Sequence, residues 1–287
     1  MDIGFIGAGE MGAGLAWAFG RAGHTCRAVA SGRSAETQAR MAEAGMEPVD
    51  DLAALNASSQ VIFSVLPPEL AEPEAQALAE ATRDGGPLVF VEANAISPMR
   101  ARRIAGMFGD NVRVIDGGII GMPPSEDNRP RIYVSGPGAD VLAPLDRAGI
   151  EICPLGDDIG RASAMKMTYA GLTKGTNALL TAVLLAGEQM DLTEALRQEL
   201  SDSQPAMFAK AETTVPRLPA DAGRWVFEMR EIAETFRSEG VPGGFHDGAA
   251  EIMDLMAGSE FGHETRRSRD RDRTSAQTIA ALARRLG

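Results

Sequence analysis

Cysteine and histidine are scarce in this sequence, with two cysteines and three histidines among 287 residues. Cys26 and Cys153 alone cannot form a disulfide framework or a cysteine-rich zinc site, and the scattered histidines offer no cluster of metal ligands. The sequence therefore predicts no metal centre. So few cysteines also fit a reducing, cytoplasmic environment.

Positive charge is also in short supply, because 28 lysines and arginines are set against 40 aspartates and glutamates, for a net charge of −12. Nucleic acids and anionic membranes attract basic surfaces, so neither is an expected partner. No apolar run approaches the ~18 residues of a membrane span, and the first residues lack the basic start of a signal peptide. We expect a cytoplasmic protein that acts on a small molecule.

The composition is that of an ordinary globular chain, 44% hydrophobic and 24% charged, with enough residues for two domains. In the first half, short apolar segments alternate with helix-length segments. The apolar segments are 3–6, 25–30, 61–66, 88–93, 112–115, 131–135 and 150–153. This pattern predicts an α/β domain over 1–157 with a Rossmann-type, doubly wound, mostly parallel sheet, followed by an all-α substrate and dimerisation domain over 158–287.

The first apolar segment is followed directly by Gly-x-Gly-x-x-Gly and then by a predicted helix. In this context the first glycine permits a tight turn, the second lets the backbone approach a pyrophosphate, and the third allows close helix packing. The alternative is a strand-to-helix turn that binds nothing. We predict that the whole loop contacts a dinucleotide; its residues are Gly7, Ala8, Gly9, Glu10, Met11 and Gly12.

The choice of nucleotide is indicated by the residues just after the second apolar segment. Enzymes that prefer NAD usually place an acidic residue there to bind the ribose 2′-hydroxyl, and this chain has none. Ser31, Arg33 and Ser34 stand there instead. A guanidinium flanked by hydroxyls suits a 2′-phosphate, so the sequence predicts NADP, with NAD less favoured. The alternative is a solvated turn whose arginine has no specific role.

Ligands of doubly wound sheets bind at the carboxyl ends of the strands. Leu66 and Pro67 close the third apolar segment and Asn94 follows the fourth, so these three residues are predicted cofactor contacts. After the fifth segment come Asp116 and a pair of glycines, which predict a loop with backbone amides open to a ligand. Such a loop is often only a turn.

A long helix is predicted over about 159–187, where no proline occurs and where Asp157 and Asp158 offer an N-terminal cap. With ~100° per residue, Lys166 and Asn177 fall on one polar face. A lysine beside so much apolar surface is costly to bury without a partner, so Lys166 is the best candidate for the chemical step. The alternative is that this face is the solvated side of an amphipathic helix.

Four blocks of the sequence occur in an order and at a spacing that are typical of one enzyme family. They are the glycine loop with Met11, the turn Asn94-Ala95-Ile96-Ser97-Pro98, the loop Asp116-Gly117-Gly118-Ile119-Ile120-Gly121, and the helix start Gly160-x-Ala162-x-x-x-Lys166. Together they resemble the β-hydroxyacid dehydrogenase family, in the superfamily related to 6-phosphogluconate dehydrogenase, over residues 1 to about 190. The resemblance implies an NADP-dependent oxidoreductase that moves a hydride between the cofactor and a small hydroxy acid or related alcohol.

The resemblance also implies roles for single residues. Lys166 would be the general acid and base, and Asn94 would contact cofactor and substrate and help to orient the lysine. Asn177 is a second candidate for orienting it, by its helix face alone. The predicted substrate contacts are Asp116, Gly117, Gly118, Ile119, Tyr169, Lys174, Glu228 and His246. For Glu228 the alternative is a solvated helix face, and for His246 a core or capping histidine.

The family's helical half usually builds a subunit interface, so a homodimer is expected, with the last predicted helix, 279–286, as a candidate contact. Three departures separate this chain from the family: Ile120 replaces a common serine, Ala170 replaces the asparagine four residues after the lysine, and a Lys-Asp pair on a later helix is missing. The chain thus resembles a little-characterised branch with a divergent C-terminal domain. The alternatives are an imine reductase, a class that generally lacks the lysine, and a non-catalytic NADP-binding regulatory protein.

Overall fold

The computed structural model describes residues 1–83 and 85–286, and the chain divides into two compact units, Met1–Met167 and Thr168–Gly287. The first unit is α/β and the second is helical, which confirms the predicted fold class. The units meet inside helix α6 (Arg161–Gln189), whereas the sequence placed the boundary ahead of that helix. The first turns of α6 therefore belong to the sheet unit.

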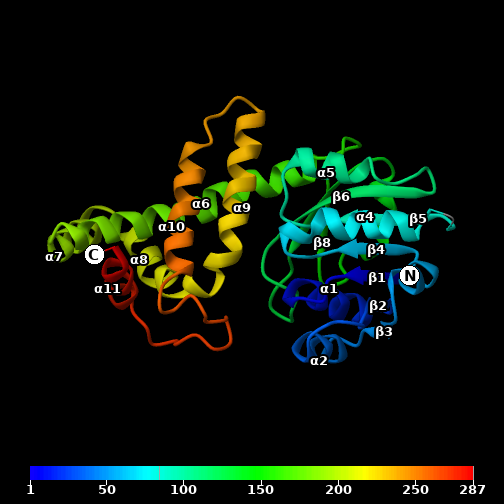
Figure 1. The fold of residues 1–287 in the computed structure, drawn as a ribbon, viewed down its shortest axis with the longest axis horizontal. Helices are drawn as coiled ribbons and strands as arrows, with labels where there is room; N and C mark the ends of the chain where they lie inside the picture. Colours follow the sequence, from blue (N-terminus) through cyan, green and yellow to red (C-terminus); the bar gives the residue numbers. More distant parts are fainter. Residues whose placement is uncertain (84, 287) are drawn as a thin grey trace. The chain divides into compact units, whose positions relative to one another are not determined.

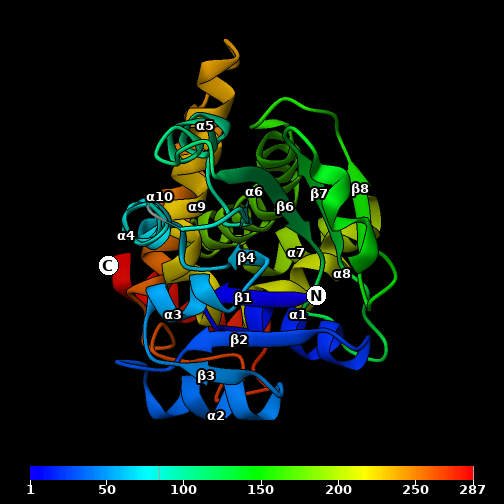
Figure 2. The same cartoon turned by 90° about the vertical axis from the view of Figure 1, so that its right-hand side faces the viewer.

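Within the described residues, eight strands form one sheet in the order β3-β2-β1-β4-β5-β6-β7-β8, seen in Figure 2. Their bounds are β1 (Asp2–Ile6), β2 (Thr25–Val29), β3 (Glu47–Val49), β4 (Val61–Ser64), β5 (Leu88–Glu92), β6 (Val112–Ile120), β7 (Arg131–Ser135) and β8 (Glu151–Pro154). Neighbouring strands are parallel except for β6 and β7. The sequence did not predict β3, which is short and contains a proline. Strand β1 lies between β2 and β4, so the chain builds the sheet first to one side of β1 and then to the other. Ligands of such sheets bind at the point where the strand order reverses in this way.

Helices cover both faces of this sheet (Figure 1). They are α1 (Glu10–Arg21), α2 (Ala35–Glu43), α3 (Leu52–Ala57), α4 (Ala71–Ala81) and α5 (Pro98–Ala105), with the 3-10 turns η1 (Pro68–Leu70) and η2 (Ala139–Leu145). Side chains alternate between the faces along each strand. Phe63 thus packs with Phe19 of α1 in one apolar core, while its neighbour Ile62 packs with Leu78 of α4 in the other.

Strand β6 is longer than the sequence predicted. Asp116 and the glycine pair after it lie inside this strand, where Gly117 pairs with Val134 and Gly118 with Tyr133 of the antiparallel β7. The predicted loop at Asp116 is therefore wrong. A glycine pair usually indicates a turn. Here Gly118 instead makes room for helix α6, because a Cβ at this position would lie 2.4 Å from the Ala162 carbonyl oxygen.

The second unit is built from helices (Figure 1). They are the remainder of α6, then α7 (Thr193–Ser203), α8 (Pro205–Thr214), α9 (Pro219–Ser238), α10 (Gly244–Ala257) and α11 (Ser275–Leu286), with the 3-10 turn η3 (Val215–Arg217). Ile279 and Leu282 on the apolar face of α11 are buried within the chain, so this face is not free for a partner subunit. Among residues 1–83 and 85–286, no helix is long and apolar enough to cross a membrane.

Candidate active site

The glycine loop has the geometry that a dinucleotide requires. Gly7 has φ +103°, and a Cβ there would lie 2.2 Å from the carbonyl oxygen of Val65. A Cβ on Gly12 would lie 2.2 Å from the carbonyl oxygen of Gly7, so only glycine lets α1 approach the loop. Gly9 differs, because nothing lies within 4 Å of the place where its Cβ would be. The open space above Gly9, at the N-terminus of α1, fits a pyrophosphate.

The residues after β2 are arranged as a helix start. Ser34 caps α2, because its hydroxyl accepts a hydrogen bond from the Thr37 amide at 3.2 Å. Ser31 is exposed, and Arg33 is half-buried with no hydrogen bond or ion pair from its guanidinium to any residue that the structure describes. Arg33 is thus the side chain of this group that is free to bind an anion, whereas Ser34 also has a structural role.

Arg40 is a second basic residue here, and no sequence motif indicated it. One of its terminal nitrogens donates weakly to the Ala8 carbonyl oxygen at 3.4 Å, and the other pairs with Glu36 at 2.8 Å. Its Nε is buried and has no hydrogen-bond partner in the described part of the chain. Because α2 brings Arg40 back to the glycine loop, Arg40 is a further candidate to contact a phosphate bound at that loop.

Asn94 links the ends of two strands. Its side-chain oxygen accepts from the Leu66 amide at 2.5 Å, and its side-chain nitrogen donates to the Ser64 hydroxyl at 2.8 Å. It is buried, 3% exposed. This arrangement sets the position of Leu66 and Pro67 beyond β4, so the structure supports Asn94 as a residue that shapes the cofactor site. None of these hydrogen bonds joins Asn94 to Lys166, so its role in orienting the lysine stays a prediction.

Glu92 is a buried acid that the sequence reasoning missed. One carboxyl oxygen accepts from the Asn94 amide at 2.9 Å, and the other is buried with no partner among the residues that the structure describes. Asp116 stands beside it in register on β6. Burial raises the pKa of the Glu92 carboxyl to about 8, against the opposing effect of the Asn94 hydrogen bond. Glu92 is therefore mostly a neutral acid at pH 7.

This buried acid predicts a pH dependence of stability. The pKa of Glu92 is higher in the folded chain than in the unfolded one, so its contribution to stability is present at low pH and is lost as the pH rises toward 8. Glu92→Gln should remove that loss. The free energy of unfolding of the variant, relative to that of the parent, should therefore rise by up to ~1.4 kcal/mol per pH unit between pH 5 and 8. Urea unfolding at both pH values measures the gain. An unchanged difference between variant and parent, or an equal gain for the exposed Glu43→Gln, would contradict it.

Asp116 holds the start of helix α6. Its carboxylate accepts four hydrogen bonds: from the Ser135 hydroxyl at 3.0 Å, the amides of Gly160 and Ser163 at 2.9 Å each, and the Ser163 hydroxyl at 2.5 Å. Asp116 is completely buried. Its predicted role as a substrate ligand finds no support here, since its acceptor sites are used within the fold. The α6 cap thus comes from this distant strand residue, instead of the predicted Asp157 and Asp158.

The glycine pair brings α6 against β6. A Cβ on Gly118 would lie 2.4 Å from the Ala162 carbonyl oxygen and 3.1 Å from the Lys166 Cβ, so any larger residue would push the helix away. In this position the Lys166 Nζ donates to the Ile119 carbonyl oxygen at 2.6 Å. Lys166 is half-buried. Its ammonium group is thereby held over the end of β6, in the unit that also carries the glycine loop.

Asn177 lies about three turns further along α6, roughly 16 Å of helix rise from Lys166. This is beyond the reach of a hydrogen bond, so helix geometry does not support Asn177 as the residue that orients the lysine. Its side-chain oxygen is buried, and within residues 1–83 and 85–286 it has no hydrogen-bond partner. Ala170, between them on the same face, is buried at 3% exposure, so this face is not solvated.

Two of the predicted substrate contacts meet in the helical unit. Lys174 of α6 forms an ion pair with Glu228 of α9; the Glu228 side chain is buried and that of Lys174 is partly buried. The Lys174 Nζ also lies 5.1 Å from the centre of the Trp225 ring. Burial lowers the pKa of Lys174, while Glu228 opposes this shift. The alternative of a solvated Glu228 is thus excluded, and sequence reasoning missed the pairing because the partners lie on different helices.

His246 and Tyr169 have opposite surroundings within the same unit. His246 is buried, with its ring 4.4 Å from that of Phe236, and burial lowers its pKa. Its Nδ1 has no partner among the described residues. This is the environment of a core histidine. Tyr169 is 45% exposed, which leaves it free for a ligand or a partner.

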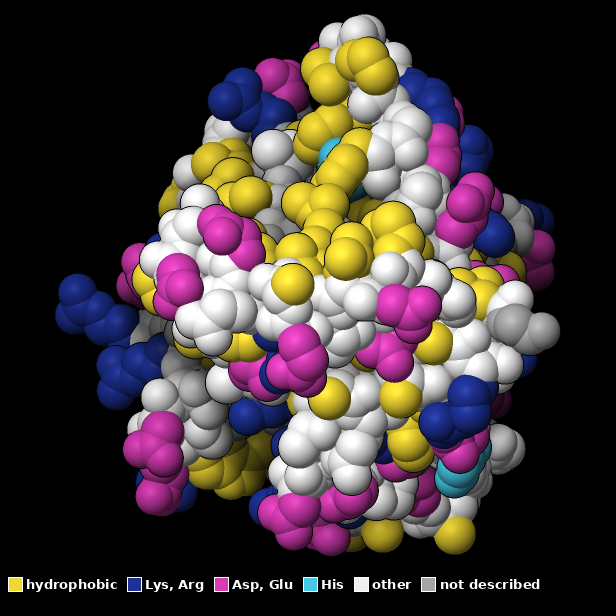
Figure 3. All heavy atoms as spheres, turned by 90° about the vertical axis from the view of Figure 1, so that its left-hand side faces the viewer, with side chains coloured by type: hydrophobic (Ala, Val, Ile, Leu, Met, Phe, Trp, Pro, Cys, Tyr) yellow, Lys and Arg dark blue, Asp and Glu magenta, His cyan; other side chains and the backbone are white. Residues whose placement is uncertain are grey.

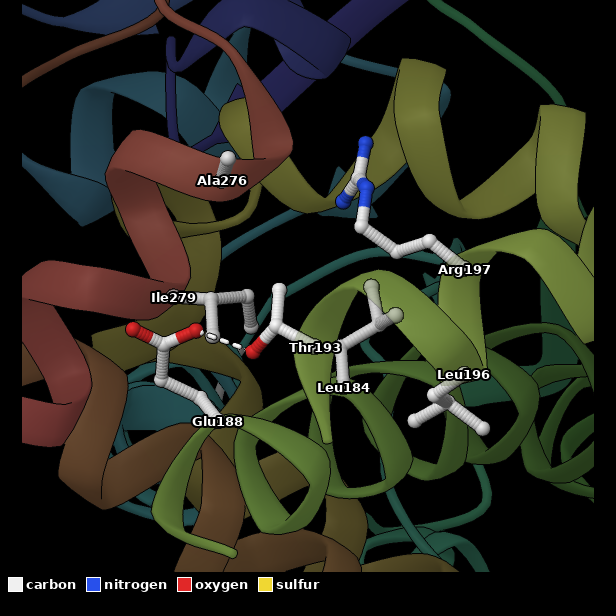
Figure 4. A pocket seen from close by; sticks show the side chains of 7 residues that line it. All are labelled: Leu184, Glu188, Thr193, Leu196, Arg197, Ala276 and Ile279. Atoms are coloured by element: carbon white, nitrogen blue, oxygen red, sulfur yellow. Dashed lines mark hydrogen bonds between the residues drawn. The ribbon is translucent and has the colours of Figure 1, made fainter. Parts of the chain in front are cut away.

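A small pocket also lies in the helical unit, between α6, α7 and α11 (Figure 4). Thr193 donates to Glu188 inside it at 2.5 Å, and Arg197 on its rim pairs with Glu212. Its volume of about 10 Å³ holds no more than one water molecule. The pocket is therefore a packing gap. Among the described residues, no three histidine, cysteine or acidic side chains are grouped to hold a metal ion.

Comparison with known families identifies both parts of the chain. Residues 2–143 match the NAD binding domain of 6-phosphogluconate dehydrogenase, and residues 188–256 match a domain of unknown function, DUF1932. These matches confirm the superfamily and its separate C-terminal domain. The first part of the chain is thus an NAD-binding domain of this superfamily, which supports a nicotinamide-dinucleotide-dependent oxidoreductase.

Solved structures agree with this class. The conserved protein MTH1747 of unknown function, described as structurally similar to 3-hydroxyacid dehydrogenases, is 27% identical, with 90% of this chain and 97% of that chain covered and a TM-score of 0.66. The 3-hydroxyisobutyrate dehydrogenase of Mycobacterium tuberculosis, solved with L-serine, is 16% identical over 99% and 98% of the chains, with a TM-score of 0.72. The reductive aminase of Aspergillus terreus, solved with NADPH, cyclohexanone and allyl amine, is 19% identical over 100% and 99%, with a TM-score of 0.55. The last two show the fold alone.

Proposed function

We propose that this protein transfers a hydride between NADP and the carbinol carbon of a small hydroxy acid or related alcohol, with Lys166 as the general acid and base. The observation that carries the proposal is the position of Lys166. Its Nζ is held at the Ile119 carbonyl oxygen, on a helix whose start is fixed by the buried Asp116. A lysine held by main-chain and buried contacts is preorganised for proton transfer.

The chain's own residues would divide the work between binding and proton transfer. The glycine loop and the N-terminus of α1 bind the pyrophosphate, and Arg33 and Arg40 contact the 2′-phosphate. The bound cofactor supplies the acceptor or donor of the hydride. During oxidation the electron pair of the C–H bond leaves as hydride, and the hydroxyl proton passes to Lys166 Nζ in its amine form. During reduction the ammonium returns that proton to the carbonyl oxygen.

The substrate class is supported by the fold neighbours. Hydroxyisobutyrate and L-serine, named with the Mycobacterium tuberculosis enzyme, are both small acids with a hydroxyl group on the β carbon. We also propose a cytoplasmic homodimer, on the cysteine usage and the apolar surface of the helical unit. Tyr169 is the predicted substrate residue whose exposure leaves it available. Glu228 and His246 are buried and Lys174 is partly buried, so these three would act from within the helical unit.

A second candidate function is imine reduction, because the reductive aminase shares this fold over the whole chain. Lys166 argues for the alcohol chemistry, since imine reductases that resemble this family generally lack the lysine. The deciding experiment is an assay of the purified chain against hydroxy acids with NADP⁺, and against aldehyde acids, keto acids and cyclic imines with NADPH. Turnover of imines alone would overturn the proposed substrate class. Nucleotide binding without any turnover would instead indicate a regulatory protein.

Cofactor preference gives a separate prediction. NADP should bind more tightly than NAD by ~1–3 kcal/mol, the scale of a charge-assisted contact to the 2′-phosphate. Arg33→Ala should remove most of that difference, and Arg40→Ala should remove part of it. Calorimetric titration of each variant with both nucleotides measures this, with the exposed Arg267→Ala as control. Equal affinity of the parent for NADP and NAD would refute the assignment.

A further inference from the structure

The first unit carries a groove that takes no part in the proposed chemistry. It lies between the second half of α1, the segment 125–129 that joins β6 to β7, and the turn 147–149 ahead of β8, all within Met1–Met167. Its volume is about 420 Å³, which falls in the range of pockets that hold small molecules. The groove is thus large enough for an organic molecule, and not only for an inorganic ion.

Basic side chains dominate the lining of this arginine groove. Arg21, Arg129 and Arg147 line it, and Glu126 is the acidic residue among its described lining residues, so the lining has a net charge of +2. The whole chain has a net charge of −12. On the molecular face drawn in Figure 3, acidic side chains are interspersed with the basic ones. The arginine groove is therefore a local positive site on an acidic protein, and such a site attracts anions.

The fold neutralises these guanidinium groups poorly. Arg21 lies 4.0 Å from the Glu126 carboxylate, at the limit of an ion pair. Arg147 lies equally far, 4.0 Å, from Asp146. Arg129 forms no hydrogen bond or ion pair with any residue that the structure describes. Because a guanidinium can donate two parallel hydrogen bonds to one phosphate, three of them suit a phosphorylated ligand.

The floor of the arginine groove is apolar. Ala18 and Ala148 are buried there, and Trp17 is half-buried. The Arg21 guanidinium lies over the Trp17 ring, 5.1 Å from its centre, so a positive charge stands directly beside the apolar floor. A ligand that fills the groove would therefore carry phosphate at the arginines and an uncharged organic part against the tryptophan.

The backbone of Arg147 favours a binding role for this residue. Its φ is +67°, in the left-handed region that residues other than glycine seldom adopt. Two residues later a Cβ on Gly149 would lie 2.8 Å from the Ala18 Cβ, so the turn packs closely on α1. Glycine would be the least strained residue at position 147 too, yet the chain has arginine there. Strained positions of this kind cluster at sites where the side chain has a function.

The arginine groove is separate from the predicted dinucleotide site. The pyrophosphate is expected at Gly9, at the start of α1. Trp17 and Arg21 follow it by eight and twelve residues, roughly 12 and 18 Å of helix rise. No residue of the glycine loop lines the groove, and neither does Arg33. A molecule in the groove would thus be bound in addition to the cofactor.

We propose that the arginine groove binds a phosphorylated organic molecule of about nucleotide size, with its phosphate groups on the three arginines and its organic part against Trp17. Each guanidinium then gains a strong acceptor that the fold does not supply. Because the arginines are exposed, the affinity should fall as salt is added.

The fluorescence of Trp17 provides a direct readout, because the chain has one other tryptophan, Trp225. Trp225→Phe removes an indole nitrogen that has no partner among the described residues, and leaves Trp17 as the only reporter. In this background ATP, used as the probe, should change the Trp17 signal saturably, with a dissociation constant below ~1 mM. Inorganic tripolyphosphate should bind more weakly, since it lacks an organic part. Tripolyphosphate that bound as tightly as ATP would indicate an inorganic anion site and overturn the proposed ligand class.

Arginine variants test the phosphate contacts. Arg129→Ala and Arg147→Ala should each weaken ATP binding at least ~10-fold, the scale of one charge-assisted hydrogen bond, whereas the exposed Arg83→Ala should not. Arg147→Gly should lose affinity in the same way and yet raise the urea midpoint of unfolding, because glycine adopts positive φ without strain. A purely structural arginine would leave ATP binding unchanged. That result for both Arg129→Ala and Arg147→Ala would overturn the proposal.

NADP distinguishes the arginine groove from the dinucleotide site. The ATP titration should give the same dissociation constant with and without saturating NADP, and Arg33→Ala should not change it. An ATP signal that disappears when NADP is present would place ATP in the dinucleotide site and contradict the proposal, as would the absence of ATP binding by fluorescence and calorimetry. None of these measurements needs a substrate or turnover, so they are independent of the proposed reaction.

Discussion

Replacing Lys166 with alanine should lower the turnover number ~10²–10⁴-fold while leaving the affinity for NADP nearly unchanged, because a positioned general acid and base contributes that much to the rate. The lysine touches the Ile119 carbonyl oxygen, outside the glycine loop, so nucleotide binding does not depend on it. Lys166→Arg should be almost as damaging. A guanidinium stays protonated near neutral pH and cannot accept the hydroxyl proton.

The control for this prediction is Lys210→Ala, which removes a lysine from α8 in the helical unit and should turn over at the parent rate. Steady-state kinetics on the best substrate of the panel gives the rates, and calorimetry gives the NADP affinity. A merely structural lysine would have a different signature: reduced folding stability with activity per folded molecule retained. A folded Lys166→Ala protein with near-parental turnover would show that the proposed mechanism is wrong.

The second large effect is expected at Asp116, and it falls on stability. Asp116→Ala would leave the hydroxyls of Ser135 and Ser163 and the amides at the start of α6 without their acceptor in a buried site. Each buried group left unsatisfied costs about 1–3 kcal/mol before the surroundings relax. We expect a total loss of roughly 3–5 kcal/mol, the range found when one partner of a buried charged network is removed.

Urea unfolding followed by circular dichroism measures this loss. Asp158 provides a matched control, because it stands near the same helix start but is exposed and makes only a long ion pair with Arg161 at 3.9 Å. Asp158→Ala should change the free energy of unfolding by less than about 0.5 kcal/mol. If both alanine variants unfolded at the same urea concentration, the assignment of Asp116 as the cap of α6 would be refuted.

The parts of the site that could be predicted from sequence are those built from adjacent residues. The glycine loop follows its strand directly and precedes its helix, so strand, turn and helix signals all lie within one short window. Arg33 was proposed in the same way, by its place after the second strand. Lys166 was proposed because it lies on the predicted long helix and because the blocks of the resemblance preserve the spacing of the helix start.

The parts that could not be predicted depend on contacts between distant segments. The local pattern at Asp116 is that of a turn, but β7 pairs with this segment and keeps it extended, and α6 then uses the carboxylate as its cap. Lys174 and Glu228 are separated by 54 residues and meet only when α6 packs on α9. The sequence left open which face of α6 is buried, because apolar residues occur on both faces and their periodicity alone does not separate the two.

The unit boundary at Met167 lies one residue after the lysine of the proposed chemistry, and this has a practical consequence. The glycine loop, Asp116, Ile119 and Lys166 all belong to the first unit, so the residues to which we assign nucleotide binding and proton transfer lie in one module. Ala170, which replaces the asparagine common in the family, lies in the second unit. We therefore expect a chimera joined at this boundary to keep the proposed reaction of its first unit.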